Sequence, residues 1–221
     1  GMRLGLSPHS PHTVSAPLLA GLAGLARRWR LPMQIHVAES PAELQLHRDG
    51  SGPLREALGS LLAGWQPSGL SPVAYLESLG VLAAAPTLVH MIHVDAADIR
   101  LVGRHGCSVV HCPQSNDALR CGRFPWEEYA KASVTVAFGT DSRGSALSLD
   151  VREQVGAALE LHGPRIAPQA AVWSAVKGGY RALGMQPPRL VRGERFSRVH
   201  RWGDAVASGR QGAWQDRRAG P

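Results

Sequence analysis

Cysteine is scarce in this chain and forms no paired motif. The 221 residues contain 3 cysteines, Cys107, Cys112 and Cys121, and no Cys-x-x-Cys sequence joins any two of them. This odd set gives no reason to expect an oxidising compartment. The apolar run around Cys107 instead predicts that this thiol is a small buried side chain.

Long apolar runs are also missing. The sequence has no stretch of 18 apolar residues that could cross a membrane, and no signal peptide at its start. We therefore expect a cytoplasmic protein with no membrane partner.

A nucleic-acid-binding motif is absent, although the chain is basic. Its 24 Lys and Arg residues outnumber 17 Asp and Glu residues, for a net charge of +7. The positive residues are scattered rather than arranged along one helix, which favours a basic surface over a binding site for nucleic acid. The alternative, a nucleic-acid binder, predicts DNA binding that weakens steeply with salt.

What the chain does contain is a regular alternation of short apolar runs and amphipathic segments, which is typical of parallel α/β folds. Strands are expected at residues 2–6, 33–37, 87–91, 107–111 and 134–139. Helices are expected after Ser15 (with Leu18, Leu22, Leu25 and Trp29 at helical spacing), after Ser40, from Ser71 to Gly80, from Asp95 to Arg104, and over 150–162 and 168–184. Residues 48–72 form a long, partly helical excursion.

The number of strands indicates an incomplete barrel. A closed (β/α)8 barrel needs eight strands and about 250 residues, whereas this chain supplies five strands. We expect residues 1–186 to form the C-terminal portion of such a barrel. Residues 187–221, rich in Arg and Pro, are expected to add a strand to an accessory sheet or to be disordered.

Five side chains follow the predicted strands in equivalent places. They are His9, His36, His90, His111 and Asp141. Reactive groups of a β/α barrel lie where strands end, on one rim, so five such residues together indicate a site, although each histidine alone is more often structural. His12 is ambiguous, and we interpret the remaining histidines as ordinary surface or helix residues: His47, His93, His105, His162 and His200.

The residues at these strand ends form specific sequence motifs. The segments are SPHSPHT at 7–13, IHVAE at 35–39, LVHM at 88–91, VHCPQSN at 110–116 and FGTDS at 138–142. In order and spacing, from Leu4 to Gly184, the chain resembles the amidohydrolase superfamily, in the branch of cytosine, guanine and S-adenosylhomocysteine deaminases and triazine chlorohydrolases. The resemblance implies a partial TIM (β/α)8 barrel with about strands 4 to 8.

The resemblance also implies roles for individual residues. His36 and Asp141 match metal ligands, and Asp141 is also implied to be catalytic, taking a proton from the metal-activated water. Glu39 matches the catalytic acid/base, and His90 matches a histidine that polarises the substrate. His9, His111 and Asn116 match residues at the substrate pocket. The implied cofactor is a divalent metal, zinc first and iron as the alternative.

The implied reaction is attack by metal-activated water on a small-molecule substrate. The bond cleaved would be a carbon–nitrogen bond, other than a peptide bond, in a cyclic amidine or aminated heterocycle. Structural alternatives exist: Asp141 can cap the following loop, and Glu39 can be a first-turn charge on a helix.

One motif of the family is missing. Its first strand ends in a His-x-His pair of metal ligands, and no His-x-His occurs in these 221 residues. With only His36 and Asp141 as recognisable ligands, we expect the chain to bind a metal weakly. Without the other barrel strands, both edges of the sheet would have unpaired backbone groups. Enzymatic activity is therefore left open between a hydrolase that is complete only with an N-terminal half and a catalytically inactive truncated barrel that persists by self-association. An isolated chain is also expected to form a homodimer through those edges.

Overall fold

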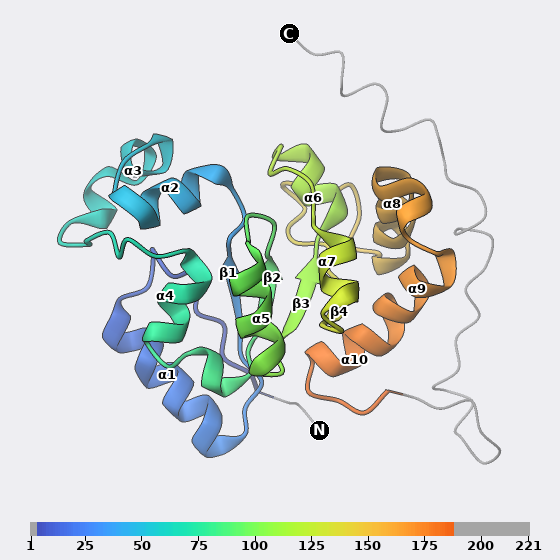
Figure 1. Cartoon of the computed structure of the whole chain (residues 1–221), viewed down its shortest axis with the longest axis horizontal. Coiled ribbons are helices and arrows are strands. Elements are labelled where there is room, and N and C mark those ends of the chain that lie inside the picture. Colours follow the sequence, from blue (N-terminus) through green and yellow to red (C-terminus); the bar gives the residue numbers. More distant parts are fainter. Residues whose placement is uncertain (1–3, 188–221) are drawn as a thin grey trace, which may run out of the picture.

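A four-stranded parallel sheet forms the centre of the molecule (Figure 1). The computed structural model describes residues 4–187, so the predictions for His200 and the 187–221 tail lie outside the described residues apart from residue 187. The strands follow chain order, β1-β2-β3-β4, and every neighbouring pair is parallel. Their bounds are Gln34–Val37, Thr87–His90, Ser108–His111 and Thr135–Phe138. The predicted α/β class with a parallel sheet is confirmed.

The first predicted strand is wrong in its described part. Leu6 forms only an isolated parallel bridge with Met33. Pro8 follows at once, and a proline has no N–H to give to a ladder. The chain nevertheless continues along the free side of β1, because the His36 amide donates to the His9 carbonyl oxygen at 3.0 Å.

Helical segments connect the strands and cover the sheet (Figure 1). The α-helices are α1 Ala16–Trp29, α2 Pro41–Asp49, α3 Pro53–Leu58, α4 Pro72–Ser78, α5 Ala96–Arg104, α6 Pro113–Ala118, α7 Trp126–Lys131, α8 Val151–His162, α9 Pro168–Trp173 and α10 Gly179–Ala182. Between α9 and α10 the helix widens into a π-helical turn, η4, at Ser174–Gly178. Among the described residues, no helix is long and apolar enough to cross a membrane.

Most of the predicted helix starts are confirmed by capping hydrogen bonds. Ser71 accepts from the Ala74 amide, and Asp95 forms a full capping box with Asp98. Ser40 accepts from the Glu43 amide, but the Glu43 carboxylate accepts from the amides of Ala38 and Glu39 and not from that of Ser40. Ser15 is the residue before α1, as expected, but its side chain makes no capping hydrogen bond.

The predicted spacing of apolar residues identifies the buried face of α1 only in part. Leu18, Leu25 and Trp29 are largely exposed, whereas Leu22 is half-buried against the core. The α1 residues that are fully buried in the core are the neighbouring Leu19, Ala23 and Ala26.

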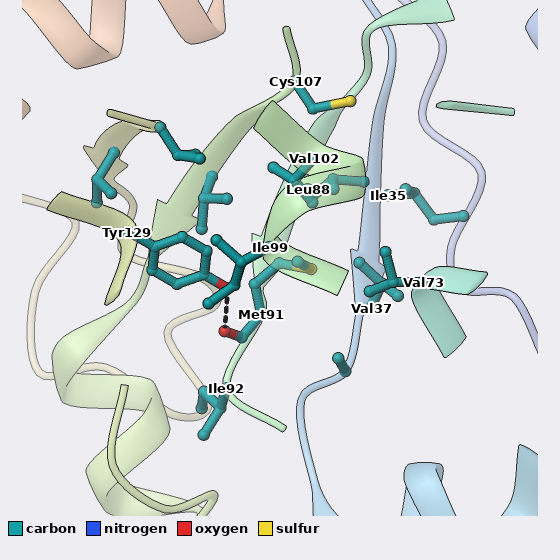
Figure 2. Packing of buried hydrophobic residues seen from close by; sticks show 14 of the residues in the cluster. Ile35, Val37, Val73, Leu88, Met91, Ile92, Ile99, Val102, Cys107 and Tyr129 are labelled. Atoms are coloured by element: carbon teal, nitrogen blue, oxygen red, sulfur yellow. Dashed lines mark hydrogen bonds between the residues drawn. The ribbon is translucent and has the colours of Figure 1, made fainter. Parts of the chain in front are cut away.

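Apolar side chains from the strands and helices share one core. Figure 2 shows Ile35 and Leu88 of the sheet packed with Ile99 of α5 and Val73 of α4. Cys107 belongs to this cluster with 3% exposure, which confirms its predicted burial. The Tyr129 hydroxyl donates to the Met91 carbonyl oxygen at 2.8 Å, so a side chain of α7 holds the chain just after β2 (Figure 2).

Two adjacent glycines give a sharp test of how η4 packs on β4. A Cβ at Gly178 would overlap the carbonyl oxygen of Val136, whereas a Cβ at Gly179 would meet nothing within 4 Å. We expect Gly178→Ala to lower the free energy of unfolding by about 2–3 kcal/mol or more, because backbone must move. Gly179→Ala should raise it by about 0.5–1 kcal/mol, as for glycine in a helix. Urea unfolding measures both, and equal effects would contradict this packing.

Candidate active site

The carboxyl ends of the strands meet in one pocket. Five of the seven predicted site residues line it, in a volume of about 360 Å³: His9, His36, Glu39, His90 and Asp141. The other two, His111 and Asn116, line a second pocket of about 420 Å³. The structure therefore brings together the predicted metal ligands and acid/base residues, and it places His111 and Asn116 as neighbours of His90 rather than in the same pocket.

The backbone turns sharply where it delivers these groups. Ala38, His90, Met91 and Asp141 all have positive φ, between 50° and 73°. Non-glycine residues adopt this left-handed region at a cost and need surrounding contacts to hold them there. Such turns after β1, β2 and β4 explain how short strands can direct several polar side chains into one space.

Glu43 holds the turn after β1. Its carboxylate accepts from the amides of Ala38 at 2.9 Å and Glu39 at 2.8 Å, and it is 3% exposed. Burial raises the pKa of Glu43 to about 7, although the two amide hydrogen bonds act against that rise. Sequence reasoning missed this role. Ser40 followed by Glu43 matches the capping-box pattern, which predicts that the Glu43 carboxylate binds the backbone amide of Ser40 at the start of the helix.

One carbonyl oxygen orients His36. The Nδ1–H of His36 donates to the His9 carbonyl oxygen at 2.9 Å, and the His36 amide donates to the same oxygen. A neutral ring with its proton on Nδ1 has a lone pair on Nε2. This is the arrangement in which protein carbonyls prepare histidines as metal ligands.

A chain of hydrogen bonds extends from His90 into the interior. His90 Nδ1 donates to Asn116 Oδ1 at 2.8 Å, Asn116 Nδ2 donates to His111 Nδ1 at 3.0 Å, and His111 then donates through Nε2 to His162 Nε2 at 3.1 Å. Since each partner fixes the next tautomer, the His90 lone pair lies on Nε2. Burial, followed by the nearby His162 and His90, lowers the pKa of His111, which keeps this ring neutral.

His162 was interpreted as an ordinary surface or helix residue; it is the last residue of helix α8, but it is buried rather than at the surface. It is 4% exposed and accepts the hydrogen bond from His111. No local pattern distinguishes it, since 51 residues separate it from His111 in the sequence.

Serine hydroxyls hold Asp141. Ser115 donates to Oδ2 at 2.6 Å and Ser145 to the same oxygen at 3.1 Å. Burial alone would raise the pKa of Asp141, but these hydrogen bonds and the nearby His90 and His36 lower it overall. The Ser145 contact was not predicted, because it lies beyond the FGTDS segment.

The donor groups fit a divalent metal. Nitrogen atoms of His36 and His90 and a carboxylate oxygen of Asp141 lie within 4.8 Å of one another, and we call these three residues the strand-end cluster. Neutral imidazoles with free Nε2 atoms and an ionised carboxylate are the ligand types that zinc and iron accept. The chain therefore offers a third donor, His90, beyond the two predicted ligands.

Glu39 lies beside this cluster. Its Oε1 is 3.6 Å from His90 Nε2, and the Cys121 thiol points to the same oxygen at 3.6 Å. Burial, then the Glu39 charge, raises the pKa of Cys121 to about 12, so the thiol stays protonated beside Glu39. The arrangement can accept a proton from a molecule in the pocket and return it.

Known sequences resemble the chain over most of its length. A family model described as the amidohydrolase family matches residues 1–187. An aminodeoxyfutalosine deaminase of Deinococcus radiodurans is 48% identical over 211 residues, covering 91% of this chain and 50% of the relative. A 5-methylthioadenosine/S-adenosylhomocysteine deaminase of Syntrophobacter fumaroxidans is 33% identical over 190 residues, covering 83% and 40%. The chain thus spans half or less of the length of these relatives.

Solved structures agree with these sequence matches. An adenosine deaminase from Xanthomonas campestris with bound zinc has a TM-score of 0.67 at 29% identity, covering 81% of this chain and 38% of that one. A Helicobacter pylori aminofutalosine deaminase in complex with methylthio-coformycin has a TM-score of 0.73 at 19% identity, covering 87% and 48%, and shows similarity of fold alone. The predicted resemblance to the deaminase branch is confirmed, and nothing in these matches supports the alternative of an inactive barrel.

Replacing Asn116 tests the tautomer chain. Asn116→Leu removes the acceptor for His90 Nδ1–H and the donor for His111. We expect His90 to lose its single tautomer in ¹⁵N NMR of the imidazole rings, and the protein to lose about 1–3 kcal/mol of stability, because two buried polar atoms are unpaired. Asn116→Asp is the matched control: it keeps the acceptor for His90, so the His90 tautomer should persist. An unchanged His90 spectrum in Asn116→Leu would contradict the account.

The pH dependence of stability tests the burial of His162. Burial, then the charge of Arg123, lowers the pKa of His162 below its ordinary value of 6.5. A lowered histidine pKa stabilises the fold above pH 6.5, and this contribution is lost as the pH falls, because the unfolded chain binds the proton first. When the pH falls from 7.5 to 5.5, the free energy of unfolding of His162→Phe, measured with urea, should therefore decrease by up to about 1 kcal/mol less than that of the wild type. An equal decrease in the wild type and in His162→Phe would contradict the lowered pKa of His162.

Proposed function

Because the chain belongs to the amidohydrolase family, we propose that it supplies the C-terminal part of a metal-dependent hydrolytic deaminase. In this proposal β1 to β4 are strands five to eight of a (β/α)8 barrel, and the segment around Leu6 follows the path of strand four. The remaining strands would come from an N-terminal segment of the whole protein, with a homodimer as the alternative.

One observation carries the proposal: the strand-end cluster and Glu39 lie together in the pocket at the carboxyl ends of the strands. This is the face on which barrel enzymes carry their active sites. The four residues arrive from three different strands, and packing of the sheet alone gives no reason for that convergence.

We assign His36 and Asp141 as metal ligands, with zinc as the first candidate and iron as the second. His36 Nε2 is free because Nδ1 is bonded to His9, and Asp141 keeps a second carboxylate oxygen besides the one bonded to the serines. A divalent ion bound there supplies hydroxide near neutral pH.

His90 and Glu39 would handle protons. The Nδ1–H of His90 is committed to Asn116, so its Nε2 faces the pocket as an acceptor. Once protonated at Nε2, the same ring can donate to a developing negative charge on the substrate. The Glu39 carboxylate, 3.6 Å from that nitrogen, can take up a proton and deliver it to a ring nitrogen or to departing ammonia.

The substrate class follows from the relatives. Aminodeoxyfutalosine deaminase is 48% identical, and other relatives are named for methylthioadenosine and S-adenosylhomocysteine. We therefore propose a small aminated heterocycle of nucleoside type, with aminodeoxyfutalosine as the first substrate to try.

Four variants test this division of roles in one set of assays. Ammonia release from aminodeoxyfutalosine and from 5-methylthioadenosine is measured on the whole protein, with the N-terminal part of the barrel present, after loading with zinc. Bound zinc is measured by equilibrium dialysis. Glu39→Gln and His90→Gln should lose about 10²–10⁴ in rate and keep their zinc. His36→Gln and Asp141→Asn should lose the zinc bound at the strand-end cluster, and the activity with it.

Glu128→Gln is the control, because Glu128 lies on the surface in an exposed pair with Lys131. It should keep both zinc and activity. Wild-type rates in Glu39→Gln, or no ammonia from the zinc-loaded whole protein with either substrate, would contradict the proposed function.

A further inference from the structure

A second group of metal-ligating side chains shares no residue with the strand-end cluster. His12, Glu43 and His47 each place one ligand atom within 4.8 Å of the other two. Glu43 and His47 are four residues apart on α2, so they lie on the same face of the helix. His12 comes from the turn between the Leu6 segment and α1. We call these three residues the α2 cluster.

The polar atoms of the α2 cluster are buried without partners. Both ring nitrogens of His47, which is fully buried, and Nδ1 of His12 have no hydrogen-bond partner among the described residues. An unpaired buried polar atom costs about 1–3 kcal/mol. His47 was interpreted as an ordinary surface or helix residue; it lies on helix α2, but it is buried rather than at the surface.

The remaining atoms of the cluster are already oriented. His12 Nε2 lies 3.3 Å from the Ser10 hydroxyl, which leaves Nδ1 directed to Glu43 Oε1 at 4.0 Å. The Trp65 and Tyr75 rings flank His47 at 5.4 and 5.2 Å between centroids. His47 is therefore in contact with two aromatic rings besides the other residues of the cluster.

Glu43 contributes the carboxylate of the cluster. It is buried, and the described residues give it no ion pair with lysine or arginine; its one charged-pair neighbour is His12. An imidazole ring that is neutral keeps one lone pair for a metal.

From these contacts we propose that the α2 cluster binds a divalent transition metal, with zinc as the best fit to two imidazoles and one carboxylate. Ligand atoms of a tetrahedral zinc site are about 3.3 Å apart, so the present 4.0 Å between His12 and Glu43 closes with a small rotation. The site would also tighten the turn after β1, because Glu43 holds the amides of Ala38 and Glu39.

The test removes the strand-end cluster first. In the full chain carrying His36→Gln and Asp141→Asn, equilibrium dialysis should still find one zinc per chain, and Co²⁺ should give the visible absorption of a four-coordinate site. Adding His47→Gln or His12→Gln should weaken Co²⁺ binding at least tenfold. His105→Gln, a histidine paired with Glu77 on the surface, is the control and should change nothing.

Both His47→Gln and His12→Gln are tested because His12 is less buried than His47, so its replacement disturbs the fold less. Circular dichroism checks that each variant is folded. No bound metal in the chain carrying His36→Gln and Asp141→Asn, or a Co²⁺ affinity that His47→Gln and His12→Gln leave unchanged, would overturn the proposal and leave a water-filled polar cavity. These outcomes do not depend on ammonia release, so they are independent of the proposed function.

Discussion

Two hydrogen bonds to one carbonyl oxygen set the geometry on which the site depends. The His9 oxygen accepts from the backbone amide and from the ring Nδ1 of His36. The first bond keeps the Leu6–His9 segment alongside β1, although no regular strand forms there. The second fixes the tautomer of His36 and frees Nε2 for a metal. A single contact thus joins the edge of the sheet to the chemistry at its end.

The other strand ends follow the same principle with different partners. The backbone enters the left-handed region at Ala38, Met91 and Asp141, and each turn is held by a side chain from elsewhere: Glu43 for the first, Tyr129 for the second and the two serines for the third. Because these partners lie on α2, on α7, on α6 and in the loop before α8, the helices around the sheet determine how the reactive groups lie. Helices that do not touch the pocket therefore contribute to its shape.

The sequence predicted what depends on short spacing and missed what depends on long-range packing. Strand ends, the helix starts at Ser71 and Asp95, and the meeting of His36, Glu39, His90 and Asp141 follow from local pattern and from the geometry of parallel strands. The exposed face of α1, the burial of His162 and the convergence of His47 with His12 depend on which elements pack together, and residues far apart in the chain carry no local signal of that. Glu43 shows the limit most clearly, because a capping-box pattern and a buried support for the turn require the same residue at the same place.

The claim that connects these features is that His36 and Asp141 bind a metal at the carboxyl ends of the strands. X-ray anomalous scattering at the zinc edge, from crystals of the full chain grown with zinc, measures this directly. The account predicts a peak about 2.0–2.2 Å from His36 Nε2 and from a carboxylate oxygen of Asp141, with His36 Nδ1 still bonded to the His9 oxygen. A crystal with zinc bound elsewhere and none between these two residues would contradict it.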